Sequence, residues 1–119
     1  MMKLLKSFAF AFQGVVTALR TQQNMRIHLL AVLVVTISGV FLELAAIEWS
    51  VIALTFGLVL VAEMMNTAFE FLVDMVSPEH NEKAGMVKDI AAGAVLLAAI
   101  IATVVAVYIF GNKIFNLLL

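Results

Sequence analysis

The sequence has no cysteine, a single proline and few charged residues. The absence of cysteine among its 119 residues excludes a disulfide framework and a thiolate metal site. Charged residues make up 13% of the chain, and the net charge is −1. This balance provides no broad basic surface, so we expect no nucleic-acid partner. The length is enough for one domain but not for a separate soluble catalytic domain.

Hydrophobic residues dominate what is present. They make up 65% of the sequence, whereas roughly half is usual for a soluble domain. Uncharged runs cover residues 29–42, 49–62 and 90–112. Since roughly 20 helical residues cross a bilayer core of about 30 Å, each run can belong to a transmembrane helix. We therefore predict an all-α integral membrane protein with one domain, 1–119, and transmembrane helices at about 28–47, 49–76 and 86–111.

The N-terminal segment differs from these runs. Its apolar side chains recur at helical spacing, at Leu5, Phe8, Phe12, Val15 and Leu19. Its polar side chains fall mostly on the other side of the helical wheel, at Lys3, Lys6, Gln13 and Thr17. This pattern predicts an amphipathic helix at about 3–22 that lies at the membrane surface. A signal peptide with a basic start at Lys3 and Lys6 is the competing interpretation. It is disfavoured because Gln13 interrupts the apolar run and no small-x-small cleavage site follows.

The basic residues predict the orientation in the membrane. Six of the seven precede the first predicted span or lie between the second and third: Lys3, Lys6, Arg20 and Arg26, then Lys83 and Lys88. None separates the first span from the second, and only Lys113 follows the third. Loops rich in lysine and arginine stay on the cytoplasmic side. We therefore expect the N-terminus and the loop at 77–88 in the cytoplasm.

Polar side chains gather on one face at the end of the second predicted span. On a helical wheel they lie within about 100° of one another, and the rest of that helix is apolar. The residues on this face are Glu63, Asn66, Thr67, Glu70 and Asp74. Counted from Trp49 at the outer interface, Glu63 lies about 21 Å inward, so the face crosses the cytoplasmic edge of the hydrocarbon.

Two interpretations of this face are possible. The carboxylates could hold the helices of an oligomer together, but charges at such depth are costly and usually functional. Three carboxylates on one face repel one another unless a cation is present, which favours a metal or active site. Oxygen ligands suit Mg²⁺ better than Zn²⁺, and Lys88 could neutralise a transferring phosphoryl group. The chain has neither a GxxxxGK[ST] loop nor the protein kinase signatures, so phosphoryl transfer would not use a standard nucleotide fold.

The polar face belongs to a longer motif. The run ExxNTAxExxxD from Glu63 to Asp74 is followed by Pro78-Glu79 and Lys88-Asp89, and NMRIH stands at 24–28. This pattern resembles the bacterial membrane diacylglycerol kinase and undecaprenol kinase family over nearly the whole chain. The resemblance implies a homotrimer in the bacterial inner membrane, each subunit with one surface helix and three transmembrane helices. It also implies Mg²⁺-dependent transfer of the γ-phosphate of ATP to the primary hydroxyl of a membrane lipid at the cytoplasmic interface.

The same resemblance implies roles for single residues. Glu63 matches the proposed general base that takes the proton of the lipid hydroxyl, and Asn66 matches a polar partner that positions phosphate and substrate. Glu70 matches the carboxylate that holds the metal and the nucleotide. The other implied nucleotide contacts are Asp74, Asp89, the phosphate-binding Lys88, and Glu79 and Asn81 in the covering loop.

Three further positions have weaker assignments. Gln22 stands where the family has an acidic metal ligand, and its carbonyl can coordinate Mg²⁺ without adding charge. Arg26 could contact a phosphate of substrate or nucleotide, or it could only set the topology. His28 could act as a base, but an interfacial anchor is the favoured interpretation.

A membrane protein without catalytic activity is the alternative function, either an oligomer or a small ion-coupled transporter. A transporter carries its carboxylates near the midplane of the bilayer. Here they lie at one end of a span, which favours the enzyme. The NMRIH element is similar to the undecaprenol kinase branch, so undecaprenol is the favoured substrate and diacylglycerol the second.

Overall fold

The chain is helical throughout, apart from its connections. The computed structural model describes residues 1–119 and contains α1 (Met2–Thr21), α2 (Gln23–Phe41), α3 (Ala46–Val76) and α4 (Glu82–Leu118). Each helix is long and apolar enough to cross a membrane. The prediction of an all-α membrane protein is confirmed.

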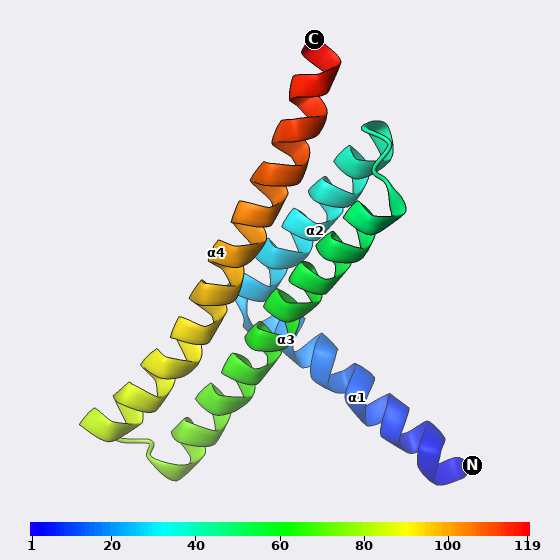
Figure 1. Cartoon of the computed structure of the whole chain (residues 1–119). Helices are drawn as coiled ribbons and strands as arrows, with labels where there is room; N and C mark the ends of the chain where they lie inside the picture. The colour runs from blue at the N-terminus through cyan, green and yellow to red at the C-terminus, as the bar shows by residue number, and fades with distance from the viewer.

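Three of the helices form a bundle. Helices α2, α3 and α4 lie side by side, while α1 leaves the bundle in a different direction (Figure 1). The α2–α3 turn and the C-terminus lie at one end, and the α3–α4 loop lies at the other (Figure 1). Helix α3 packs most extensively on α4 and also contacts α2 and α1. It is therefore the helix from which a side chain can reach every other element.

None of the three connections between the helices contains a glycine. The break between α1 and α2 is a single extended residue, Gln22, with φ −115° and ψ 115°. Helix α4 begins after Pro78, and Asn81 caps it by accepting hydrogen bonds from the backbone N–H groups of Lys83 at 2.9 Å and Ala84 at 3.4 Å. Because Pro78 lies in the loop, it removes no helical hydrogen bond.

The turn between α2 and α3 lies inside the first predicted span. Helix α2 ends at Phe41, whereas the prediction continued to residue 47, and α3 begins at Ala46 rather than at 49. Glu43 adopts a left-handed φ of 54°, and the Leu44 N–H donates to the Gly39 carbonyl at 3.1 Å. This closure satisfies a carbonyl at the helix end. Glycine usually occupies the left-handed position, so a sequence with Glu43 there carries no signal for the turn.

Gly39 allows α2 and α3 to approach each other beside this turn. A Cβ atom at residue 39 would lie 2.6 Å from Cη2 of Trp49 and 2.8 Å from Cδ1 of Leu44. The indole therefore occupies the space that any side chain at residue 39 would need. Trp49 is partly buried in the bundle by this contact.

Gly39→Ala is expected to destabilise the protein by about 1–3 kcal/mol, the usual cost of overpacking a filled site. The loss would appear as a lower Tm in detergent micelles. Gly111→Ala is the matched control, because an added Cβ at residue 111 meets no atom within 4 Å. Its Tm should stay level or rise, since alanine favours helix over glycine by up to about 1 kcal/mol. Equal effects of the two substitutions would contradict the close approach at Gly39.

The far end of α4 is tied to the same turn. Helix α4 extends to Leu118, beyond the predicted limit of 111. Lys113 pairs with Glu48 at 3.1 Å and donates to the Glu43 carbonyl at 3.4 Å.

The buried apolar residues form two clusters. Leu44, Ile52 and Ile109 lie next to the α2–α3 turn, and Val59, Ala98 and Ala102 lie between α3 and α4. The polar residues of α3 follow on the side of the α3–α4 loop.

Candidate active site

The polar face of α3 changes from buried to exposed along the helix. Glu63, Asn66 and Thr67 are 0%, 5% and 4% exposed, and they are the buried polar side chains of the chain. Glu70 is partly exposed and Asp74 is exposed. One helix face thus connects the interior of the bundle with the surface near the α3–α4 loop.

Glu63 is the deepest charged group. Neither oxygen of its carboxylate has a hydrogen-bond partner. Nε2 of His28 lies 3.9 Å from Oε2 of Glu63. The Thr67 hydroxyl donates to the Glu63 backbone carbonyl at 2.9 Å, which accounts for the polarity of Thr67 within the helix. Burial of a carboxylate costs several kcal/mol, so its presence here marks a candidate functional group.

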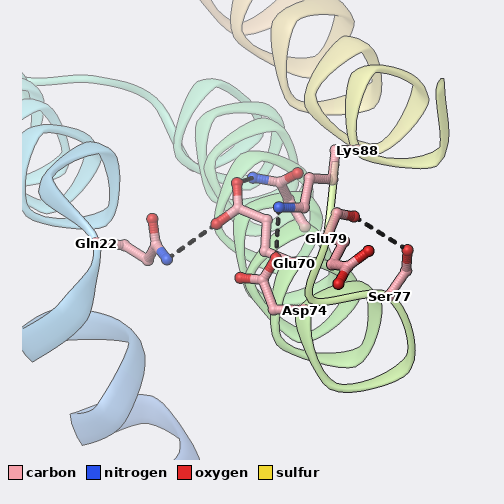
Figure 2. Close-up of polar contacts among 7 residues, drawn as sticks. Gln22, Glu70, Asp74, Ser77, Glu79 and Lys88 are labelled. Atoms are coloured by element: carbon pink, nitrogen blue, oxygen red, sulfur yellow. Dashed lines mark hydrogen bonds and ion pairs between the residues drawn. The ribbon is translucent and has the colours of Figure 1, made fainter. Parts of the chain in front are cut away.

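Glu70 is held by two amides from different parts of the chain. Nε2 of Gln22 donates to Oε2 of Glu70 at 3.1 Å, and Nδ2 of Asn66 donates to Oε1 at 3.3 Å. Figure 2 shows Gln22 reaching from the connection between α1 and α2 toward Glu70 on α3. The structure therefore brings the three residues into one cluster.

Asp74 and Lys88 meet across the gap between α3 and α4. Nζ of Lys88 lies 2.5 Å from Oδ1 of Asp74 (Figure 2). A hollow of about 280 Å³ between the helix ends is lined by these two residues, Glu79 and neighbouring loop residues. Asp89 and Arg26 are exposed and form no ion pair.

A second hollow lies deeper in the bundle. Its volume is about 280 Å³, and its polar lining residues are Asn24, His28, Glu63 and Asn66. Its other walls are largely apolar and include Ala92 and Val95 of α4. Such a site suits a small polar group at the end of a hydrocarbon chain.

The residues at Glu70 fit a magnesium ion that also binds phosphate. The single chain contains no group of three or more His, Asp or Glu side chains that could hold a metal. Mg²⁺ does not need one, because it usually takes one or two carboxylates and leaves its other positions to water and phosphates. The Gln22 and Asn66 amides turn their NH₂ groups toward Glu70. A half-turn of either amide would present its oxygen as a second protein ligand.

The position of His28 differs from the one that its place in the sequence predicts. The favoured interpretation was an interfacial anchor, whereas its ring lies beside Glu63. A usable signal was present, because α2 and α3 form an antiparallel hairpin. Residues at similar distances from the turn lie opposite each other in such a hairpin. That count places His28 opposite Val59, about one helical turn from Glu63.

The fold and the site define a helical membrane protein with an acidic polar site toward one end of its bundle. The sequence model of the family described as "Prokaryotic diacylglycerol kinase" matches residues 9–110. The chain belongs to this family, as its motif predicted.

Individual relatives carry two different names. The chain is 38% identical over 111 residues to an "Undecaprenol kinase" of Bacillus subtilis (strain 168), which covers 93% of this chain and 90% of that protein. It is 48% identical over 103 residues to a "Diacylglycerol kinase" of Synechocystis sp., covering 86% of this chain and 59% of the relative. It is also 28% identical over 102 residues to a "Diacylglycerol kinase" of Escherichia coli (strain K12), covering 86% and 84%. The chain thus spans less than two thirds of the Synechocystis protein.

Proposed function

We propose that this protein is an ATP-dependent lipid kinase that phosphorylates the primary hydroxyl of undecaprenol. Family membership favours a lipid kinase over a transporter or an oligomer without catalytic activity. The observation that carries the proposal is the graded face of α3. Fully buried Glu63 lies at one end, and exposed Asp74 with its partner Lys88 lies at the other. Such a face connects a site for a membrane-embedded alcohol to a site for a water-soluble nucleotide.

In the proposed reaction the oxygen of the lipid hydroxyl attacks the γ-phosphorus of ATP, and Glu63 accepts the proton of that hydroxyl. A bond forms between that oxygen and phosphorus. The bond from phosphorus to the β–γ bridging oxygen breaks, and ADP leaves with the electron pair. Asn66 can help to orient the hydroxyl, because its buried Oδ1 has no hydrogen-bond partner. Positioning and charge neutralisation supply most of the rate enhancement in such transfers.

The nucleotide would bind in the hollow at the α3–α4 loop. Lys88 pairs with Asp74 at the edge of this hollow. When the nucleotide binds, a phosphate would replace the Asp74 carboxylate as the partner of Lys88. Glu79 and Asn81 lie in the loop, whereas Asp89 lies about two turns into α4. All three would contact the outer part of the nucleotide. Glu70, with Gln22 as second ligand, would hold Mg²⁺, which when bound neutralises charge on the phosphates. Arg26 is the remaining candidate for a substrate contact.

Gln22→Glu is expected to lower the Mg²⁺ concentration needed for half-maximal rate by about tenfold, or about 1.4 kcal/mol. The added carboxylate would face Glu70 at the position where Gln22 now donates a hydrogen bond. Titration of the phosphorylation rate with Mg²⁺ measures the change. Gln23→Glu is the matched control, because it adds the same charge at the exposed neighbouring position. An equal shift in both variants would argue against direct metal contact at residue 22.

Undecaprenol is proposed as the lipid, with diacylglycerol as the second candidate. The NMRIH element and the alignment with the Bacillus relative along nearly all of both chains support undecaprenol. The higher identity to the Synechocystis relative supports diacylglycerol. Transfer of label from radioactive ATP to each lipid, offered separately in mixed micelles, decides between them. Label in neither lipid, with folded protein present, would overturn the lipid kinase proposal.

The proposed assembly is a homotrimer in the bacterial inner membrane, with a cytoplasmic N-terminus and active site. Only 13 of 119 residues are buried in the single chain, which leaves apolar helix faces for lipid and for other copies. Helices α2, α3 and α4 would span the membrane within one domain. Helix α1 would lie on its surface, because it leaves the bundle and carries Lys3 and Lys6 together with exposed Phe8 and Phe12 (Figure 1). Native mass spectrometry from detergent should give a mass of three chains.

A further inference from the structure

His28 is the basic side chain within ion-pair distance of the buried carboxylate. Its Nε2 atom lies 3.9 Å from Oε2 of Glu63, and the two side chains are 21% and 1% exposed. The ring comes from the N-terminal part of α2, whereas Glu63 lies on α3. The contact therefore depends on the packing of two helices.

No side chain donates a hydrogen bond to the Glu63 carboxylate, and Asn24, which lines the same hollow, forms none with it. The Asn66 amide donates to Glu70, and the Thr67 hydroxyl donates to the backbone. Both carboxylate oxygens of Glu63 lack a hydrogen bond. The separation from His28 exceeds a charge-assisted hydrogen bond of about 2.8 Å by about 1 Å, which a small rotation of either side chain can close. His28 is thus the group that can satisfy and aim this carboxylate.

The position of His28 relative to the hollows supports a role in the reaction. His28 lines the deep hollow together with Glu63 and Asn66. It also lines an apolar groove of about 250 Å³ between α2, α3 and α4, whose walls include Val35, Phe56 and Ala99. Ala99 belongs to both spaces, so the groove and the hollow adjoin. An alcohol with a hydrocarbon tail in the groove would bring its hydroxyl to His28 and Glu63 together.

We propose that His28 is a positioning residue that turns the Glu63 carboxylate toward the lipid hydroxyl. After the small rotation that closes the 3.9 Å separation, the imidazole would donate from Nε2 to Oε2 of Glu63. The contribution to the reaction rests on the proposed lipid kinase function. The pairing of the two side chains does not, so the two parts can be tested separately.

Kinetics of His28 variants test the contribution to the reaction. His28→Leu introduces an apolar side chain of similar size and removes the N–H donor. We expect kcat to fall by about 100-fold, with KM for ATP unchanged. His28→Gln keeps an N–H donor at a similar reach and should recover most of the lost kcat. Full kcat in His28→Leu would overturn the proposal. Equal losses in both variants with a lowered Tm would also overturn it, because that pattern indicates a structural role.

Nitrogen NMR of histidine-labelled protein tests the pairing without any activity. The chain has two histidines, His28 and His80, so His80 serves as an internal reference. Glu63→Gln should shift the ring nitrogen signals of His28 and leave those of His80 in place. Glu82→Gln, at an exposed carboxylate, is the matched control and should move neither ring of His28. Unchanged His28 signals in Glu63→Gln would refute the pairing. Absence of lipid phosphorylation in the unmodified protein would instead refute the proposed function.

Discussion

Glu63→Gln is expected to reduce lipid phosphorylation by a factor on the order of 10²–10⁴, the usual contribution of a general base. Glutamine keeps the shape of the side chain but cannot accept the proton of the hydroxyl. ATP binding should change little, because the residues proposed for the nucleotide lie nearer the loop. Phosphate transfer and binding of a non-hydrolysable ATP analogue, measured on the same preparation, give the two quantities.

The stability of Glu63→Gln separates catalysis from structure. The Glu63 carboxylate is buried at a desolvation cost, and its 3.9 Å approach to His28 is too long for a hydrogen bond, so its net contribution to folding is small. We therefore expect the Tm of Glu63→Gln to equal or exceed that of the unmodified protein. Glu82→Gln should retain full activity. Weakened nucleotide binding with normal turnover at saturation would contradict the role of Glu63 as the base.

Glu70→Gln is expected to lower kcat/KM for MgATP by a factor on the order of 10²–10³, or about 3–4 kcal/mol. Glu70 is the carboxylate of the cluster that both Gln22 and Asn66 contact, and its replacement would leave only amides to meet the metal. Raised Mg²⁺ should restore part of the activity. The phosphorylation rate as a function of Mg²⁺, with Mn²⁺ binding followed by electron paramagnetic resonance, measures the loss.

The response to Mg²⁺ distinguishes the two carboxylates. Glu63→Gln should remain inactive at every Mg²⁺ concentration, because its defect lies in proton transfer. Glu70→Gln should recover in part, because its defect lies in metal affinity. Full activity of Glu70→Gln at ordinary Mg²⁺ would remove Glu70 from the proposed metal site.

Much of the architecture could be predicted from local patterns. Long uncharged runs allow only helices in a membrane, because every backbone polar group must find its partner within the segment. The 3.6-residue period places the residues from Glu63 to Asp74 on one face, and that face is observed on α3. Family membership followed from the same motif.

Other features depended on contacts that no local pattern encodes. The α2–α3 turn lies at residues 42–45 for two reasons. The absence of a side chain at Gly39 leaves room for the Trp49 ring, and Glu43 takes a left-handed conformation. Both conditions involve the neighbouring helix, and the sequence there has no proline or glycine at the turn itself. The first predicted span therefore extended past the end of α2.

The sequence by itself determined the class of the protein, the membrane helices and the acidic face, since these follow from composition and helical period. Only the tertiary structure decided which groups meet that face. Gln22 reaches Glu70, and His28 comes to Glu63, because the break after α1 and the hairpin of α2 and α3 bring distant residues to the same depth. Side-chain contacts between helices depend on how the helices pack and rotate against one another, and local sequence patterns do not specify this packing.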